Sequence, residues 1–455
     1  MLQSINPATG EKGQRFKRLT GAELEAKLEI ASAAFVTWRK TPISERSALL
    51  GRIADQFEAH RDQLARTMTF EMGKPIKAAL AEVDKCTAGF RFYAEHGPAY
   101  VEDKPVEWQS GKALIRRLPI GPVLAVMPWN FPYWQVVRFL APALMAGNTG
   151  LLKHASNVPA CAQAIEDMVR LAGAPEGLFQ NLFLASDKIA GIIADDRVAA
   201  VTLTGSEGAG MSVAQAAGKA LKKVVLELGG SDPFIVMPSA DVERAADTAV
   251  QARIMNSGQS CICAKRMIVH ADVHDRFMAR FAAGMKAVKV GDPLDPATDM
   301  GPMSSLSARD DIAAQLERAV KAGATKLLGG EALPGPGAFF TPAILVDIPP
   351  DAPVAREEFF GPVAMVFKVG SIDEAIARAN DVPFGLGSSV WTNDETERQR
   401  FINEIEAGMT AINQMLASDP HVPFGGIKRS GHGRELAAEG LHEFTNLKTV
   451  FLPNP

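Results

Sequence analysis

Apolar positions recur at helical spacing through the first fifth of the chain. Leu49, Ile53 and Phe57 lie four residues apart, within a segment, 22–95, that is rich in Ala, Leu, Glu, Lys and Arg. Side chains at this spacing share one face of a helix, so the pattern predicts amphipathic helices. Pro42 and Pro75 stand where such helices would begin. We expect this segment to be mostly helical.

Beyond Pro122, short apolar runs alternate with helical stretches. The runs predict strands at 123–127, 151–152, 182–184, 198–203 and 224–228, and helices at 134–146, 159–172 and 207–221. Strands that alternate with helices indicate a parallel sheet with right-handed crossovers. Ligands bind such sheets at the carboxyl ends of the strands, so a nucleotide site is expected there.

A second α/β unit is predicted after the segment 228–231, whose paired glycines suggest a hinge. Its expected strands are 234–237, 266–269, 343–346, 363–367 and 387–391. Two units of similar size would leave a cleft between them. The segments 108–119 and 444–452 fit neither unit, and we expect them to be extended excursions that pair across a subunit interface.

Composition excludes several classes of function. The 455 residues include 48 Lys and Arg against 52 Asp and Glu, a net charge of −4 that gives no electrostatic reason to bind nucleic acid or an anionic membrane. The four cysteines are too few for a disulfide framework. We expect no leader sequence and no membrane-spanning helix, because Gly or Pro interrupts the apolar runs well before membrane-spanning length. A folded, cytoplasmic protein is expected.

Two common motifs are absent. The glycines of 205–210 follow a predicted strand, but their spacing is the reverse of the dinucleotide-binding fingerprint. His270 and His274 are four residues apart, yet Ala271 stands where a zinc protease would carry its glutamate. The sequence therefore predicts no metal site.

The chemistry-bearing candidate is Cys261. It follows a polar turn, Gly258-Gln259-Ser260, which would leave a thiol exposed at the start of an element, where a helix dipole or a nearby base lowers its pKa. The spacing alone allows either a nucleophile or a small buried hydrophobe. Cys263, two residues on, either packs in the core or serves as a redox partner for Cys261.

Four segments together resemble the NAD(P)-dependent aldehyde dehydrogenase superfamily. They are 128–132 (PWNFP), 226–230 (LELGG), 258–261 (GQSC) and 357–362 (EEFFGP), in the same order along the chain. The resemblance implies two Rossmann-like α/β domains with a small β oligomerisation element, assembled as a homodimer or homotetramer. It places the cofactor-binding domain at 1–107 and 120–229, the catalytic domain at 230–436, and the oligomerisation element at 108–119 and 437–455.

The resemblance also implies a reaction. Cys261 would attack the aldehyde carbon, and the side-chain amide of Asn130 with the backbone N–H of Cys261 would stabilise the oxyanion. Glu227 would act as the general base that activates water to hydrolyse the resulting thioester. A CoA-acylating relative typically lacks this glutamate, so its presence favours hydrolysis. A non-enzymatic scaffold would be expected to have lost Cys261 or Glu227.

NAD or NADP is the implied cofactor. The matching positions for it are Trp129, Lys153, Gly205, Ser206, Glu358 and Phe360. Many NAD-preferring relatives carry a glutamate at the position of Ser156, where it repels a 2′-phosphate. Because Ser156 removes that repulsion, NADP is admitted and NAD is not excluded.

Within the superfamily, the chain is most similar to the shorter bacterial succinate-semialdehyde dehydrogenases. Arg138, Ser418 and Phe424 match positions that contact the substrate, and a bidentate arginine suits a carboxylate. The longer enzymes carry a second arginine where this chain has Met255, and Arg253 is the nearest candidate to replace it. We expect oxidation of succinic semialdehyde to succinate. Another small aldehyde, such as glutaric semialdehyde or an aliphatic or aromatic one, is the alternative.

Overall fold

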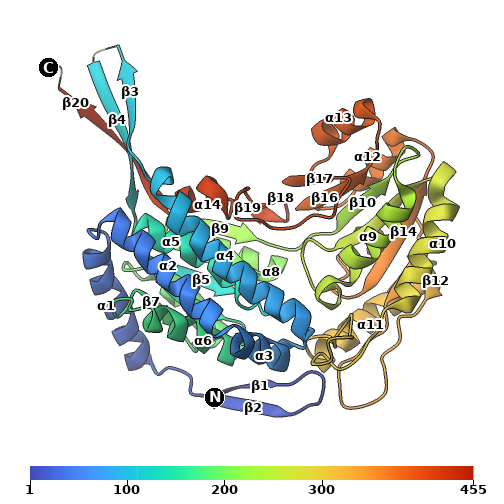
Figure 1. The fold of residues 1–455 in the computed structure, drawn as a ribbon, viewed down its shortest axis with the longest axis horizontal. Helices are drawn as coiled ribbons and strands as arrows, with labels where there is room; N and C mark the ends of the chain where they lie inside the picture. The colour runs from blue at the N-terminus through green and yellow to red at the C-terminus, as the bar shows by residue number, and fades with distance from the viewer. Residues whose placement is uncertain (110, 454–455) are drawn as a thin grey trace.

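The computed structural model describes residues 1–109 and 111–453. Two α/β units lie side by side, and a narrow sheet projects from the first of them (Figure 1). The first unit opens with the predicted helical segment, in which α2 and α4 start directly after Pro42 and Pro75. Its helices are α1 (Gly21–Trp38), α2 (Ile43–Ala59), α3 (Arg61–Met72) and α4 (Ile76–Tyr100).

The first unit contains a six-stranded sheet in the order β19-β9-β8-β5-β6-β7. Its parallel strands are β5 (Pro122–Met127), β6 (Thr149–His154), β7 (Phe179–Asn181), β8 (Ala200–Thr204) and β9 (Lys223–Glu227), and β19 (Gly431–His432) is antiparallel to β9. The connecting helices are α5 (Trp134–Ala146), α6 (Pro159–Leu171), α7 (Ile189–Ala194) and α8 (Glu207–Lys219). The parallel sheet predicted from the alternation of runs is confirmed.

One strand prediction is wrong. The strand expected at 182–184 lies earlier, at β7, and the chain leaves the ladder after the N–H of Leu182 bonds to the carbonyl of Leu152. Leu182 and Leu184 are nevertheless buried, in the core beneath α7 and α8. The apolar run therefore reports burial rather than strand pairing.

Alternating side chains of the sheet serve two cores. In β5, Val123 and Ala125 pack toward the core that holds α2 to α6, whereas Leu124 packs toward the core that holds α1, α7 and α8. Successive side chains of a strand point to opposite faces, and here both faces are covered by helices. This explains why the strand reads as a continuous apolar run.

The second unit contains a seven-stranded sheet in the order β12-β13-β14-β11-β10-β16-β17. Its strands are β10 (Asp232–Val236), β11 (Ala264–His270), β12 (Thr325–Leu328), β13 (Ala343–Val346), β14 (Val363–Val369), β16 (Gly387–Trp391) and β17 (Met409–Ile412). One core contains α9 (Val242–Ile254) and α10 (Ala271–Ala287). Another contains α11 (Leu306–Lys321), α12 (Ile372–Asn380) and α13 (Glu395–Glu404). All five strands predicted here are confirmed.

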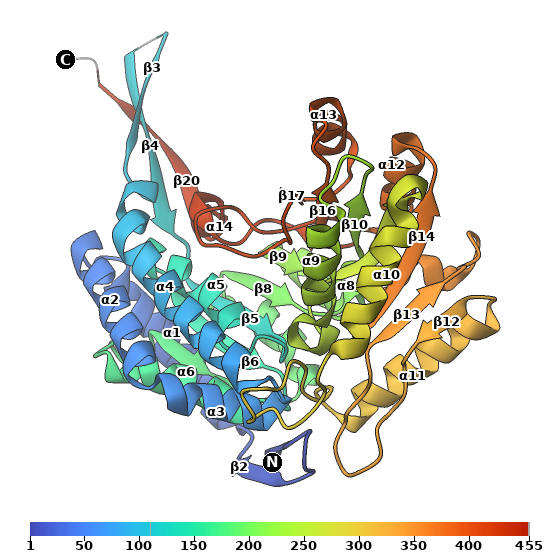
Figure 2. The same cartoon turned by 45° about the vertical axis from the view of Figure 1, so that its right-hand side comes forward.

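The two unassigned segments form a projecting arm. β4 (Gly111–Pro119) pairs with β20 (Thr445–Leu452) on one side and with β3 (Lys104–Trp108) on the other, all antiparallel. Figure 2 shows this arm extending beyond both units. The two segments are extended, as expected, and they pair with each other within the chain; the extended region begins at Lys104. Their pairing across a subunit interface stays a prediction.

Short elements complete the chain. The pairs β1 (Leu2–Ile5) with β2 (Lys12–Phe16) and β15 (Phe384–Gly385) with β18 (Ile427–Lys428) form small antiparallel sheets, α14 (Ala437–Glu443) precedes β20, and 3-10 turns span Ser186–Lys188, Met255–Gly258 and Pro353–Arg356. The N–H of Ala338 bonds to the carbonyl of Pro7, so the N-terminal segment reaches the second unit.

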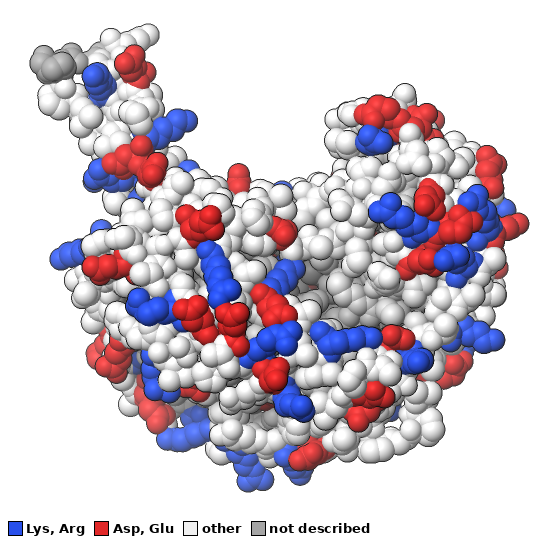
Figure 3. Space-filling view, in the orientation of Figure 1, with Lys and Arg blue, Asp and Glu red and all other residues white. Residues whose placement is uncertain are grey.

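Charges of both signs are interspersed over the face shown in Figure 3. Among residues 1–109 and 111–453, no helix combines the length and the apolar character that crossing a membrane requires.

Candidate active site

Cys261 lies in a strained turn that leads into β11. Three consecutive residues before it, Asn256, Ser257 and Gly258, have positive φ angles of 54°, 57° and 73°. This conformation costs about 1–2 kcal/mol for each residue that carries a Cβ. At Gly258 a Cβ would also collide with the backbone of Gly361. The turn thus packs directly against the segment 357–362 and brings two of the four motifs together.

Asn130 meets the same turn from the first unit. Its Nδ2 donates to the carbonyl of Gln259 at 3.1 Å, and Nδ2 of Asn256 donates to the carbonyl of Asn130 at 2.8 Å. A side-chain amide has two N–H groups, so one remains for an oxyanion that forms beside Cys261. The structure therefore brings the predicted oxyanion donor to the turn that carries the predicted nucleophile.

Glu227 ends β9 and is buried. Gly425 leaves room for its carboxyl, since a Cβ there would lie 2.6 Å from Oε1. Burial, followed by the nearby charge of Glu435, raises the pKa of Glu227 well above its ordinary value. Arg138 acts in the opposite direction and also forms an ion pair with Glu435, with 2.7 Å between Nε and Oε2. Burial therefore favours the neutral form of the Glu227 carboxyl.

The thiol of Cys261 is also held neutral. Burial raises its pKa to about 12, although Arg138 and Lys265 oppose that shift. The expectation of a lowered pKa was wrong, because Cys261 lies in a turn rather than at a helix N-terminus and desolvation outweighs the nearby cations. A base must therefore remove the proton before the sulfur can react as a thiolate.

Lys265 joins the nucleophile turn to Glu358 and was missed by the sequence analysis. Its buried Nζ donates to the carbonyls of Ser260 and Cys261 at 2.8 and 2.7 Å and pairs with Oε1 of Glu358 at 3.0 Å. The same oxygen accepts the N–H of Gly230 at 3.2 Å. A signal was present, because Lys265 and Arg266 are two charges inside an otherwise apolar strand and both are buried.

The predicted cofactor residues gather where β5, β6 and β8 end. Lys153 is buried near the end of β6, and burial followed by the charge of Arg18 lowers its pKa. Ser206 caps α8 by accepting the N–H of Ala209 at 3.4 Å, and the preceding N–H, of Gly205, bonds to the carbonyl of Glu227 at 3.0 Å. Ser156 lies in the turn between β6 and α6.

The opposite side of this region also suits a dinucleotide. The rings of Trp129 and Phe360 meet edge to face with centroids 5.8 Å apart. At Gly229 a Cβ would collide with the carboxyl of Glu358, so only glycine lets that carboxyl approach. The residues present therefore fit NAD or NADP, the cofactor that the resemblance implies.

The predicted substrate residues form a compact cluster. The Arg138 guanidinium lies 4.3 Å from the ring centre of Phe424, which is itself buried. Oγ of Ser418 accepts from Nε1 of Trp134 at 2.9 Å and from Nζ of Lys85 at 2.8 Å. Lys85 was missed, because only the tertiary fold brings α4 to the loop after β17.

Arg253 and Cys263 point elsewhere. Arg253 is fully buried and donates to the carbonyls of Gly258 at 2.8 Å and Ala264 at 3.0 Å. It therefore supports the turn, and it does not take the place of the arginine that the longer enzymes carry at the position of Met255. The thiol of Cys263 donates to the carbonyl of Met255 at 3.4 Å, and burial raises its pKa. These contacts favour the packing role for Cys263, and its redox role stays a prediction.

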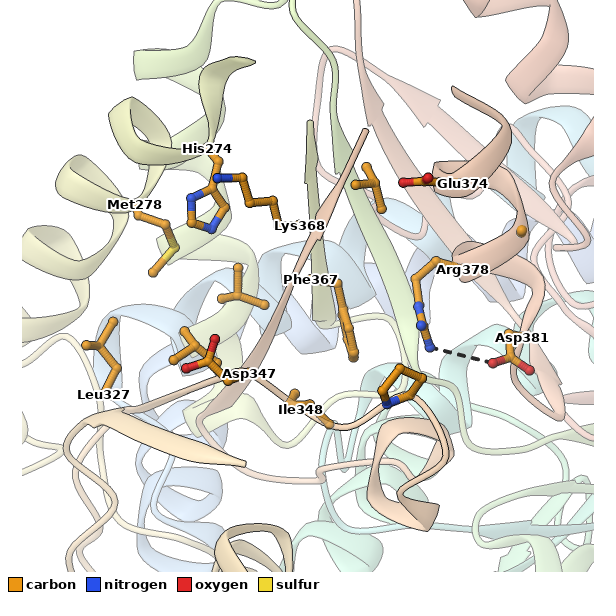
Figure 4. A pocket seen from close by; sticks show the side chains of 15 residues that line it. His274, Met278, Leu327, Asp347, Ile348, Phe367, Lys368, Glu374, Arg378 and Asp381 are labelled. Carbon is orange, nitrogen blue, oxygen red and sulfur yellow. Dashed lines mark ion pairs between the residues drawn. The ribbon is translucent and has the colours of Figure 1, made fainter. Parts of the chain in front are cut away.

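A separate cavity of about 950 Å³ lies in the second unit (Figure 4). Side chains of α10, β14 and α12 line it, including His274 and the ion pair of Arg378 with Asp381 at 3.6 Å. Cys261 does not line it. Within the described parts of the chain, no group of three or more His, Cys, Asp or Glu side chains is arranged to hold a metal ion.

Comparisons with known proteins find relatives that match over the full length of the chain. The chain is 52% identical over 454 residues to succinate-semialdehyde dehydrogenase [NADP(+)] 1 of Mycobacterium tuberculosis, covering 99% of each chain. It is 51% identical to a probable succinate-semialdehyde dehydrogenase [NADP(+)] of Synechocystis, again covering 99% of each. The solved succinic semialdehyde dehydrogenase of Streptococcus pyogenes in complex with NADP+ superimposes with a TM-score of 0.98 at 41% identity, covering 100% of both chains.

A sequence profile described as "Aldehyde dehydrogenase family" matches residues 1–450. The match covers all four motifs and nearly the whole chain. The chain therefore belongs to the aldehyde dehydrogenase family.

Proposed function

We propose that this enzyme oxidises succinic semialdehyde to succinate with NADP, and that it also accepts NAD. The observation that carries the proposal is the convergence of Cys261, Asn130 and Glu227 beside the cationic cluster of Arg138 and Lys85. The names of the relatives that match over the full length support the same substrate and cofactor.

The chain's own residues divide the chemistry between them. The ionised fraction of Glu227 takes the proton of the Cys261 thiol, and the sulfur then bonds to the aldehyde carbon. The free N–H of Asn130 stabilises the oxyanion that forms. When bound, the dinucleotide supplies the hydride acceptor. Loss of that hydride from the adduct leaves a thioester on Cys261, and Glu227 gives up the thiol proton to solvent. Glu227 then takes a proton from a water molecule, whose oxygen attacks the thioester carbon; the C–S bond breaks, succinate leaves and the Cys261 thiolate regains a proton from Glu227.

Cations near the end of β6 support the use of NADP. Lys153 lies close enough to Arg18 for that charge to lower its pKa, and Ser156 adds a hydroxyl without a negative charge. A 2′-phosphate gains from both cations, and nothing in this group of side chains repels it. A 2′-hydroxyl is not rejected either, so we infer that both cofactors are used, with NADP favoured.

Steady-state kinetics test the proposal. We expect kcat/KM for succinic semialdehyde with NADP to exceed that for butanal, an uncharged aldehyde with the same number of carbon atoms, by at least about a hundredfold, the worth of a good charge-assisted bond. Equal values of kcat/KM for the two aldehydes would reject succinic semialdehyde as the preferred substrate. They would instead favour a general small-aldehyde dehydrogenase, the alternative that Met255 keeps open.

We further propose that the arm assembles the chain into a homodimer or homotetramer, with the cofactor-binding, catalytic and oligomerisation parts divided as the resemblance implies. Trp108, Leu447 and Phe451 of the arm are exposed apolar side chains, with exposed fractions of 46%, 56% and 65%. Exposed apolar groups gathered on one element are typical of an interface. The four free cysteines suit a reducing compartment such as the cytoplasm.

A further inference from the structure

Ser418 is held as a hydrogen-bond donor. Its Oγ accepts one bond from Nε1 of Trp134 and one from Nζ of Lys85. A hydroxyl has two lone pairs and one proton, so with both lone pairs engaged its remaining capacity is to donate. A group that binds here must therefore offer acceptors.

Two further donors lie in the same cluster. The Nζ of Lys85 has three N–H groups, of which one is used by Ser418, and it lies 4.7 Å from the ring centre of Trp134. Nη2 of Arg138 is buried and has no hydrogen-bond partner among the described residues. Buried polar groups normally have partners, so these donors indicate an acceptor-rich ligand.

The charges of this cluster do not cancel. Arg138 is paired with Glu435, and Glu82, on the same helix as Lys85, is paired with Lys74. Within the described ranges Lys85 forms no ion pair. Lys85 is thus the cation of the cluster whose charge remains uncompensated.

We propose that Lys85 is a specificity-determining residue, which with Ser418 and Arg138 binds the carboxylate at the far end of the aldehyde substrate. This inference rests on the proposed function and supplies the second cation that Met255 leaves missing. A carboxylate accepts several hydrogen bonds at once, so it satisfies the hydroxyl, the ammonium and the guanidinium together.

The environment of Lys85 makes its charge dependent on pH. Burial, followed by the charge of Arg138 from α5, lowers its pKa to about 8. Cys86 and Glu82 of its own helix and Asp419 of the loop after β17 act in the opposite direction. Lys85 therefore carries its charge at pH 7 and loses it as the pH rises above that pKa, and a bound carboxylate would move the loss to somewhat higher pH.

The test compares Lys85→Met and Lys85→Arg with the wild type, using succinic semialdehyde and butanal. We expect Lys85→Met to lower kcat/KM for succinic semialdehyde about 10- to 100-fold, mostly by raising KM. The value of kcat/KM for butanal should stay the same. Lys77→Met is the matched control, because Lys77 lies on the same helix, is half exposed and pairs with Asp299. Lys77→Met should leave kcat/KM unchanged for both aldehydes.

A pH profile adds a readout that does not require the Met variant to fold. In the wild type, the ratio of kcat/KM for succinic semialdehyde to that for butanal should fall between pH 7 and pH 9.5. The ratio cancels the titration of Cys261 and Glu227, which both substrates share. In Lys85→Arg it should stay flat, since a guanidinium remains charged throughout.

The outcomes separate the two proposals. If the wild type does not prefer succinic semialdehyde, the proposed function fails. If it does prefer it, but Lys85→Met affects both aldehydes equally or neither, or the wild-type ratio is flat with pH, the role of Lys85 is overturned and the proposed function stands.

Discussion

Burial favours the neutral forms of the two groups that we propose to react. It raises the pKa of the Cys261 thiol to about 12 and that of Glu227 well above its ordinary value. Arg138 favours the ionised form of both groups, so one guanidinium connects the nucleophile, the base and the substrate cluster. We infer that changes at Arg138 will alter the chemistry as well as substrate affinity, which makes Lys85 the cleaner residue for testing carboxylate recognition.

The residue at position 156 should set the choice of cofactor. We predict that Ser156→Glu lowers kcat/KM with NADP by about tenfold or more, because the new carboxylate repels the 2′-phosphate, while activity with NAD is kept or improved. Ser156→Ala removes only the hydroxyl and should change the NADP to NAD ratio much less. An unchanged ratio in Ser156→Glu would place the 2′-phosphate away from this turn.

The residues proposed for the catalytic step could be identified from sequence motifs, but the side chains that support them could not. Cys261, Asn130 and Glu227 lie in motifs with recognisable neighbours, and the structure brings Asn130 to the nucleophile turn. Lys85 and Lys265 lack such a signature. Lys85 acquires its contact because α4 packs against a loop that is distant in sequence. Lys265 acquires its contact because the turn before β11 folds back toward that strand.

At the scale of elements, a buried ion pair supports the loop that carries Asn130. Oε1 of Glu82 accepts the N–H groups of Tyr133 and Trp134, both at 3.0 Å, and so caps the N-terminus of α5. Its other oxygen bonds to Lys74, whose Nζ lies 3.8 Å from the ring centre of Phe131. The helical segment thereby fixes the chain on both sides of residue 132.

Removing Glu82 should loosen this loop. We predict that Glu82→Ala lowers the free energy of unfolding by about 3–5 kcal/mol, because it leaves the buried Lys74 charge without a partner. It should also lower kcat, since Asn130 is no longer held. Denaturant unfolding and steady-state kinetics measure the two effects. Glu243→Ala, which breaks an exposed pair with Arg276, is the control and should change little.

The conformation of the nucleophile turn depends on glycine at position 258. Gly258→Ala combines a positive φ with a collision against Gly361, so we predict a loss of about 3 kcal/mol or more of stability, together with loss of activity. Gly10 has a similar φ of 78° but open space around it. Gly10→Ala should therefore cost only about 1–2 kcal/mol and leave activity intact. Equal effects of the two substitutions would show that packing of the turn is unimportant.

Most helices and strands could be predicted because apolar periodicity and proline positions carry them. The prediction failed at 182–184, where apolar residues are buried without pairing as a strand, and it failed at strands that are short and polar. β2, for example, has no buried residue, so its sequence lacks the alternation that marks a half-buried strand.

At the scale of the whole molecule, the arm carries apolar side chains that no other part of the described chain covers. The rings of Phe451 and Trp108 pack 5.0 Å apart, yet both side chains remain exposed. The sequence located these segments but could not specify their partner, because the pairing of β4 with β20 joins residues far apart along the chain.

A charge on the arm should reduce the size of the assembly. We predict that Phe451→Asp shifts the molecular mass measured by light scattering toward that of a single chain, because burying a carboxylate in an apolar interface is costly. Lys448→Ser, on the same strand, should leave the mass unchanged. The same mass for Phe451→Asp and the wild type would exclude this surface as the interface.

The central claim is that Cys261 carries the acyl group and Glu227 releases it. Intact-protein mass spectrometry of Glu227→Gln, mixed with NADP and succinic semialdehyde, tests it most directly. Because Glu227 also takes the thiol proton, we predict that this variant forms the thioester slowly and hydrolyses it more slowly still. One reduced cofactor per site should form, with a mass increase of one succinyl group that maps to Cys261 and turnover slowed about 10²- to 10⁴-fold. Normal turnover without an adduct, or an adduct on another residue, would contradict the account.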